Sequence, residues 1–121
     1  MAMTPEKRVK KQVVEQLKYL GAEVYYFFPM TGGYGKSGVP DIVGCFRGMF
    51  FAIECKAGKN TTTALQDREI AAIHAAEGAA WVVNESTADN VRAMLLARYN
   101  VRATMLARWN GNAFDDAELL V

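Results

Sequence analysis

Residues 40–56 read PDIVGCFRGMFFAIECK, and this stretch decides how the rest of the chain is interpreted. It contains two apolar runs rich in β-branched and aromatic residues around a short Arg-Gly segment, a pattern typical of a β-hairpin. If Arg47 and Gly48 form a two-residue turn, Asp41 lies directly opposite Glu54. Opposed residues of an antiparallel pair have Cβ atoms about 4.5–5.5 Å apart. Two carboxylates are therefore expected to meet at one end of the hairpin.

A third charge joins this end of the hairpin. Lys56 lies two residues beyond Glu54 and projects from the same face of its strand. Both faces are otherwise largely apolar, which predicts a central hairpin covered on both sides. Burying charged side chains in such a place costs free energy unless another interaction compensates for it, and a bound ligand is one such interaction. A divalent cation held by Asp41 and Glu54, with Lys56 facing a bound anion, would supply one; a structural Lys–carboxylate cluster at frayed strand ends is the alternative.

Helical and strand patterns extend from the hairpin in both directions. Thr4 is a predicted N-cap followed by proline, and Gly21 is the predicted end of that first helix. Thr63 begins a second helix with a capping box completed by Gln66, and Gly78 ends it. The patterns predict helices over residues 4–21, 63–78 and 86–98, and strands over residues 22–28, 40–46, 50–56 and 79–84.

The composition bounds the class of protein. A chain of 121 residues with 51% hydrophobic and 22% charged residues is typical of one globular domain. We therefore predict a single α/β domain over residues 1–121, in the order α-β-β-β-α-β-α, with a small mixed sheet. Two cysteines, Cys45 and Cys55, are too few for a disulfide framework. Without a signal peptide or an apolar run of roughly 18 residues, we expect a cytoplasmic protein with no membrane partner.

Positive charge is concentrated in the first half of the chain. Residues 1–59 contain nine Lys/Arg and five Asp/Glu, whereas residues 60–121 contain five and eight. This asymmetry favours a polyanion near the first half, with Lys10 and Lys11 as candidate DNA contacts. A solvated face of the first helix is the alternative.

The hairpin residues resemble the PD-(D/E)xK nuclease superfamily. The pattern is Pro40-Asp41, twelve intervening residues and then Glu54-Cys55-Lys56, and the predicted element order also resembles that superfamily's core. Within it, the chain resembles the virus-type replication-repair nuclease (VRR-NUC) family over about residues 4–97. The stretches that carry this likeness are 35–42 (GKSGVPDI), 53–56 (IECK) and 65–66 (LQ). The resemblance implies a restriction-endonuclease-like core, with residues 98–121 as a C-terminal extension.

The resemblance also implies an activity, the metal-dependent hydrolysis of DNA phosphodiester bonds. It further implies selectivity for branched or junction DNA in replication, recombination or repair. Asp41 and Glu54 resemble ligands of Mg²⁺ or Mn²⁺, joined by the main-chain carbonyl of Cys55. Lys56 resembles the group that orients the attacking water and steadies the phosphate charge.

Two further residues match the family's pattern less uniquely. Glu6 corresponds to a glutamate that often begins the first helix and reaches the metal, but a first-turn Glu also interacts favourably with the helix dipole. Gln66 corresponds to a glutamine of the site. Its alternative is the capping box with Thr63, which is compatible with a contact to the site.

The glycine-rich loop over residues 29–38 contains Gly35-Lys36-Ser37 but is not a P-loop. Met30 stands where that motif needs glycine, and a strand rather than a helix follows, which excludes an NTPase and a nucleotide cofactor. Lys36 and Ser37 are candidate contacts to a DNA phosphate, and a flexible surface loop is the alternative. Tyr34 either stacks on an unpaired base or faces solvent.

A short tandem repeat begins within the predicted third helix. The first unit, residues 90–99 (NVRAMLLARY), and the second unit, residues 100–109 (NVRATMLARW), are identical at seven of ten positions. Ten residues are too few for a solenoid repeat. The second unit therefore either extends the third helix or adds a helix that faces a partner.

Likeness to stand-alone phage and mobile-element nucleases implies a homodimer in a bacterial or phage-infected cytosol. A two-fold symmetric dimer would present two sites to the two symmetric cut points of a four-way junction. The alternatives are a sequence-specific or nicking endonuclease of the same superfamily and a non-catalytic DNA-binding module.

Overall fold

A computed structural model describes residues 3–30 and 35–110 of the chain. Its elements follow the predicted order, with two short 3₁₀ turns at Gly21–Glu23 and Ala88–Asn90. The helices and strands are α1 (Pro5–Lys18), β1 (Val24–Phe27), β2 (Ile42–Phe46), β3 (Met49–Cys55), α2 (Ala64–Ala75), β4 (Ala79–Val83) and α3 (Val91–Asn110).

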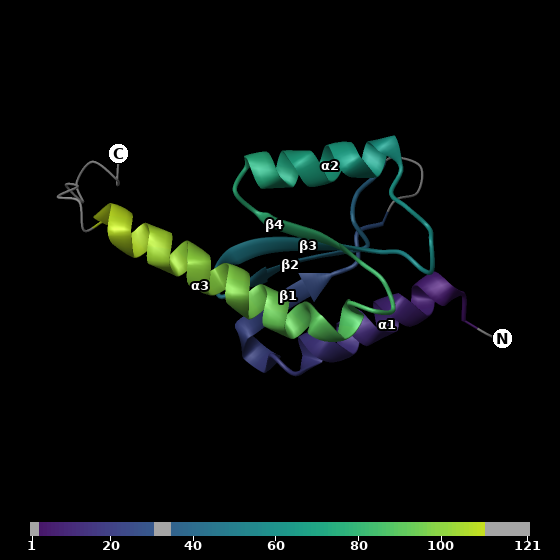
Figure 1. The fold of residues 1–121 in the computed structure, drawn as a ribbon, viewed down its shortest axis with the longest axis horizontal. Coiled ribbons are helices and arrows are strands. Elements are labelled where there is room, and N and C mark those ends of the chain that lie inside the picture. Colours follow the sequence, from purple (N-terminus) through teal and green to yellow (C-terminus); the bar gives the residue numbers. More distant parts are fainter. Residues whose placement is uncertain (1–2, 31–34, 111–121) are drawn as a thin grey trace.

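The four strands form one mixed sheet in the order β1-β2-β3-β4. The pairs β1–β2 and β2–β3 are antiparallel, and β3–β4 is parallel because α2 connects those two strands. Helix α2 lies on one face of the sheet, and α1 and α3 lie together on the other (Figure 1). This small mixed sheet between helices confirms the predicted α/β, restriction-endonuclease-like fold.

The β2–β3 hairpin has the predicted register. Ile42 pairs with Ile53 and Phe46 pairs with Met49, so continuing the ladder by one residue sets Asp41 against Glu54. Arg47 and Gly48 form the turn with φ angles of 49° and 86°. Two positive φ angles are characteristic of the type I′ turn that matches the twist of a hairpin.

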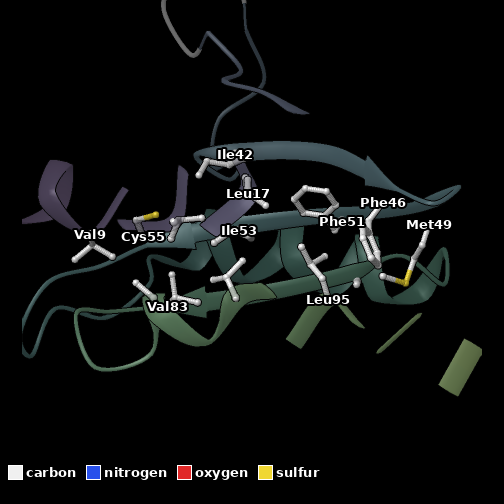
Figure 2. Close-up of a cluster of buried hydrophobic side chains, with 14 of the residues drawn as sticks. Val9, Leu17, Ile42, Phe46, Met49, Phe51, Ile53, Cys55, Val83 and Leu95 are labelled. Carbon is white, nitrogen blue, oxygen red and sulfur yellow. The ribbon is translucent and has the colours of Figure 1, made fainter. Parts of the chain in front are cut away.

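The main hydrophobic core lies between the sheet and the pair α1 and α3. Figure 2 shows side chains from α1, the central hairpin, β4 and α3 converging there. Cys55 points into this core, whereas Cys45 is on the opposite face of the hairpin, and both thiols are free. The fully buried residues include Val9, Val13, Leu17, Ile42, Phe46, Phe51, Ile53, Val83, Val91 and Leu95.

The ends of two helices differ from the sequence prediction. Helix α1 ends at Lys18, and Gly21, with φ +56°, instead begins the following 3₁₀ turn. At the end of α2 the left-handed position is taken by Glu77, with φ +68°. Gly78 is needed for a different reason: a Cβ there would lie 2.9 Å from the side chains of Ile73 and Phe50.

The third helix is later and longer than predicted. It begins at Val91 rather than at Ser86 or Thr87, because the Thr87 hydroxyl accepts a hydrogen bond from the Asn84 amide instead of capping the helix. It continues through both repeat units to Asn110, so the second unit extends the helix rather than forming a new one. Among the described helices, none has the length and apolarity needed to cross a membrane.

Candidate active site at the end of the central hairpin

The three charged residues of the motif lie at one end of β2 and β3. Asp41 directly precedes β2, Glu54 is the penultimate residue of β3, and Lys56 directly follows it. The Asp41 Oδ2 atom accepts a hydrogen bond of 2.8 Å from the backbone amide of Cys55. The Lys56 amide donates to the carbonyl of Val83 at 2.9 Å, which ties this end of the hairpin to β4. Backbone pairing therefore fixes the positions of all three residues.

Glu54 is the centre of the cluster. Only 3% of its surface is exposed, and no other charged residue of the described chain is buried to that degree. Its Oε2 atom accepts a hydrogen bond of 3.0 Å from Nε2 of Gln66, and it lies 3.5 Å from Nζ of Lys56. One group from α2 and one from the residue after β3 thus meet the same carboxylate oxygen.

The environment of Glu54 disfavours its charge. Burial raises the pKa of this carboxyl from 4.5 to about 7, and the negative charge of Asp41 adds to the rise. Lys56 and the backbone amide of Asp41 act in the opposite direction, but they do not compensate fully. A cation between the two carboxylates would reverse this balance, because it favours the ionised form of both.

Cys55 can contribute to the site through its backbone but not through its thiol. Burial raises the pKa of its thiol to about 12, and Asp41 and Glu54 raise it further in the same direction, so the thiol stays protonated. The N–H and C=O of one residue in a strand point toward the same neighbouring strand. The Cys55 carbonyl therefore points to the same side of β3 as its N–H, which is the side where Asp41 lies.

Glu6 lies near enough to the cluster for its negative charge to raise the pKa of the Cys55 thiol, but its hydrogen bond is made to the loop after β3. Its Oε1 atom accepts a hydrogen bond of 3.3 Å from the side chain of Asn60, in the loop after β3. Within residues 3–30 and 35–110, no three His, Cys, Asp or Glu side chains gather closely enough to form a metal site on their own. Asp41 and Glu54 are the two carboxylates that the hairpin brings together, and Glu6 stays a prediction as a ligand.

Gln66 makes both of the interactions that its sequence position allows. Its Oε1 atom accepts from the Thr63 backbone amide at 2.9 Å, and the Gln66 backbone amide donates to the Thr63 hydroxyl at 3.2 Å, which completes the capping box. Its Nε2 atom meanwhile reaches Glu54. The helix cap and the candidate site therefore share one side chain.

Residues 5–97 match the model of a family described as the archaeal Holliday junction resolvase (Hjc). The chain belongs to the archaeal Holliday junction resolvase family. No curated protein sequence matches it.

Membership in the Hjc family confirms the predicted superfamily, because Hjc is a family of PD-(D/E)xK nucleases. The family consists of structure-selective nucleases of branched DNA that in general depend on divalent metals. This match does not show the resemblance to the virus-type replication-repair nucleases, which stays a prediction. The matched residues include the whole charged cluster and end within the first repeat unit.

The loop before β2 rests against α2 near the cluster. Gly38, with φ +81°, lies so close to this helix that a Cβ would be 2.5 Å from the backbone of Leu65. Lys36 forms an ion pair of 3.2 Å with Glu69, although most of the Lys36 side chain is exposed. Ser37 is exposed, and Tyr34 lies outside the described residues. Sequence reasoning missed Glu69, because its pairing depends on the path of the loop.

The two candidate DNA contacts of α1 lie in different surroundings, since Lys10 is half-buried and close enough to Cys55 for its charge to lower the pKa of that thiol. The Lys10 ammonium sits 4.2 Å from the ring centre of Phe28. Lys11 is exposed and lines a surface groove with Arg8, Gln12 and the acidic Glu15. Lys11 is thus exposed whereas Lys10 is half-buried beside Phe28, and both stay predictions as DNA contacts.

Proposed function

We propose that the protein is a divalent-metal-dependent endonuclease that cleaves branched DNA, with the four-way junction as its substrate, in replication, recombination or repair. The observation that carries this proposal is the buried carboxylate of Glu54 set against Asp41, with Lys56 and Gln66 converging on it. Burying an acid beside another acid destabilises a fold, so the arrangement is best explained by a bound cation.

We propose that Asp41, Glu54 and the main-chain carbonyl of Cys55 hold Mg²⁺ or Mn²⁺. All three supply the oxygen donors that these ions prefer. When bound, the cation would lower the pKa of water and neutralise negative charge that develops on the phosphate. Gln66 keeps the Glu54 carboxylate oriented, because it donates to one of its two oxygens.

Lys56 would act on the DNA rather than on the metal. Its ammonium group lies beside Glu54, where it can donate to an oxygen of the scissile phosphate or orient the attacking water. Lys10, Lys11, Lys36 and Ser37 are the proposed contacts to flanking phosphates. For Lys36 this requires the phosphate to compete with Glu69, its partner in the structure.

We further propose that residues 1–121 act as one nuclease domain and assemble as a homodimer. A two-fold dimer would place two sites on one four-way junction. The family-like core over residues 4–97 would carry the chemistry. The narrower likeness to the virus-type replication-repair nucleases stays a prediction that rests on the GKSGVPDI and IECK stretches.

Cleavage of matched substrates tests the proposal. We expect Mg²⁺- or Mn²⁺-dependent cutting of four-way junctions in preference to flap, splayed-arm and linear duplex DNA. Sequence-dependent cutting of linear duplex would favour the alternative endonucleases, and binding without cutting would favour a DNA-binding module. Light scattering should give twice the 13.4 kDa chain mass, whereas a monomer at micromolar concentration would refute the dimer.

Variants of the cluster separate the proposed roles. Asp41→Ala and Glu54→Ala should abolish cleavage together with Mn²⁺ binding measured by calorimetry. Lys56→Ala should keep Mn²⁺ binding and most DNA affinity but slow cleavage by about 10²-fold or more, the usual scale for losing a positioned donor. Glu23→Ala, which removes an acid at the turn end of the hairpin, is the matched control. Normal Mn²⁺ binding by Asp41→Ala would overturn the metal assignment.

A further inference from the structure

The side chain of Gln66 is bound at both ends. Its carbonyl oxygen accepts from the backbone amide of Thr63 at 2.9 Å, and its amide nitrogen donates to Glu54 Oε2 at 3.0 Å. The Thr63 hydroxyl closes the ring by accepting from the backbone amide of Gln66 at 3.2 Å. A continuous chain of hydrogen bonds therefore leads from the N-cap of α2 to the buried carboxylate.

This chain permits only one orientation of the Gln66 amide. A flipped amide would place its NH₂ group against the N–H of Thr63 and its oxygen against the Glu54 carboxylate, and both contacts would be repulsive. The cap therefore determines that Glu54 meets a donor. Without the cap, the side chain would regain its other rotamers.

The same turn of α2 also supports the segment that leads to Asp41. Gly38 packs against the backbone of Leu65 and Gln66, three residues before Asp41. The first turn of α2 thus contacts the approach to one carboxylate and, through Gln66, the other carboxylate itself. A change in the seating of this turn is expected to alter the distance between the two acids.

We propose that Thr63 is a positioning residue: its N-cap geometry orients Gln66, and Gln66 holds Glu54 in the orientation that binds the cation. This inference rests on the function proposed above and adds a residue that touches neither metal nor DNA. Its effect is transmitted through one side chain, so it can be separated from a general effect on helix stability.

The chain offers a matched control in α1. Thr4 is the N-cap of that helix, and its hydroxyl accepts from the Lys7 amide at 3.2 Å, the same bond that the Thr63 hydroxyl makes. The third helical residue there is Lys7 rather than Gln, so the Thr4 cap has no connection to Glu54. Thr4→Ala therefore removes an equivalent cap without breaking any hydrogen bond to Glu54, and Glu6 in the same turn keeps its own hydrogen bond with Asn60.

The test measures Mn²⁺ affinity by calorimetry and junction cleavage at saturating DNA. Thr63→Ala should weaken Mn²⁺ binding by about tenfold, the lower end of what loss of an outer-shell partner costs. Thr63→Ser should restore binding to within about twofold, because Ser is an equally good cap. Thr4→Ala should leave the affinity unchanged even if its melting temperature falls as far as that of Thr63→Ala.

Two variants of Gln66 test the route of the effect. Gln66→Ala removes both the donor to Glu54 and the side-chain half of the capping box, so it should weaken Mn²⁺ binding at least as much as Thr63→Ala. The double variant Thr63→Ala/Gln66→Ala should bind no more weakly than Gln66→Ala alone, because residues that act in series are non-additive.

The outcomes separate this inference from the proposed function. If the parent protein binds Mn²⁺, Asp41→Ala does not, and Thr63→Ala binds as well as Thr4→Ala, the positioning role is wrong and the function stands. Fully additive losses in the double variant would likewise refute the route through Gln66. If the parent protein neither binds Mn²⁺ nor cuts DNA, the proposed function fails and the inference fails with it.

Discussion

Helix α3 contains two nearly identical units whose surroundings differ. In the first unit Val91 and Leu95 are fully buried, whereas their counterparts in the second unit, Val101 and Met105, are 53% and 62% exposed. The ring of Tyr99, at the end of the first unit, packs edge-to-face on Phe46 at 5.7 Å. The two units thus belong to one helix, but only the first packs into the hydrophobic core.

The difference follows from what lies opposite each unit. The first unit runs across the sheet, and the second continues past its edge toward the C-terminal end of α3 (Figure 1). Local sequence sets the helix in both cases, since helix propensity and spacing are the same. Burial depends on the neighbouring surface, and the repeat lengthened the helix without adding a sheet to cover it. The Hjc match also ends within the first unit, at residue 97.

Truncation of equivalent residues should separate the two units most clearly. Leu95→Ala removes a fully buried side chain and should lower the free energy of unfolding by about 2–5 kcal/mol. Met105→Ala removes a mostly exposed one and should change it by less than about 0.5 kcal/mol. Urea unfolding of both variants measures the difference. Similar losses would show that a surface covers the second unit in solution.

Glu54 is the opposite case to the second unit. The second unit exposes apolar side chains, whereas at Glu54 the fold buries an ionisable one. The folded pKa of about 7 exceeds the ordinary 4.5, so the folded protein binds this proton more tightly than the unfolded chain. The resulting stability is present below pH 4.5 and lost as the pH rises through 7. Glu54→Gln cannot ionise, and with chelator present at pH 8 it should be more stable than the parent by on the order of 3 kcal/mol. A parent stability that is constant from pH 5 to 8 would contradict this.

Much of the site could be predicted from the sequence because short-range geometry determines it. A two-residue turn fixes the register of a hairpin, and that register alone sets Asp41 against Glu54. The capping box likewise places Gln66 by local spacing, and its reach to Glu54 follows from the position of α2 over the sheet.

Features that depend on tertiary contacts could not be predicted. The end of α3 lies at Asn110 because nothing in the duplicated sequence interrupts a helix, so the pattern alone does not distinguish one long helix from two. Gly78 marks a close approach to Phe50 rather than a helix cap, and this is visible only once β3 and α2 are packed together. The Lys36–Glu69 pair and the Glu6–Asn60 hydrogen bond likewise join segments that the sequence does not place together.

Deleting one unit, so that the other takes its place against the sheet, tests the role of each unit's own sequence more sharply than truncating single side chains. Deletion of residues 90–99 would join Asp89 to Asn100, so that Val101 takes the place of Val91 and Met105 that of Leu95. Leu and Met interchange with a loss below about 1.5 kcal/mol, and Trp109 takes the place of Tyr99 as another large aromatic residue, so this variant should fold. We expect its free energy of unfolding to be about 1–2 kcal/mol below that of the variant lacking residues 100–109. Failure of the first deletion alone to fold would show that the first unit's own sequence is required.

The smallest expected difference concerns DNA, and it asks whether the second unit's arginines contribute to binding. Arg102 donates to the carbonyl of Glu77 at 3.4 Å, and the second unit lies in the half of the chain with the acidic excess. Arg102→Ala/Arg108→Ala should therefore change junction affinity by less than about twofold. Lys10→Ala/Lys11→Ala, in the basic half, should weaken binding several-fold and reduce the slope of log affinity against log salt by about 2, one for each lost phosphate contact. Fluorescence anisotropy across a salt series measures both variants. The reverse ranking would mean that the exposed end of α3, rather than α1, holds the DNA. Bound DNA would then cover the second unit, which no other part of the described fold covers.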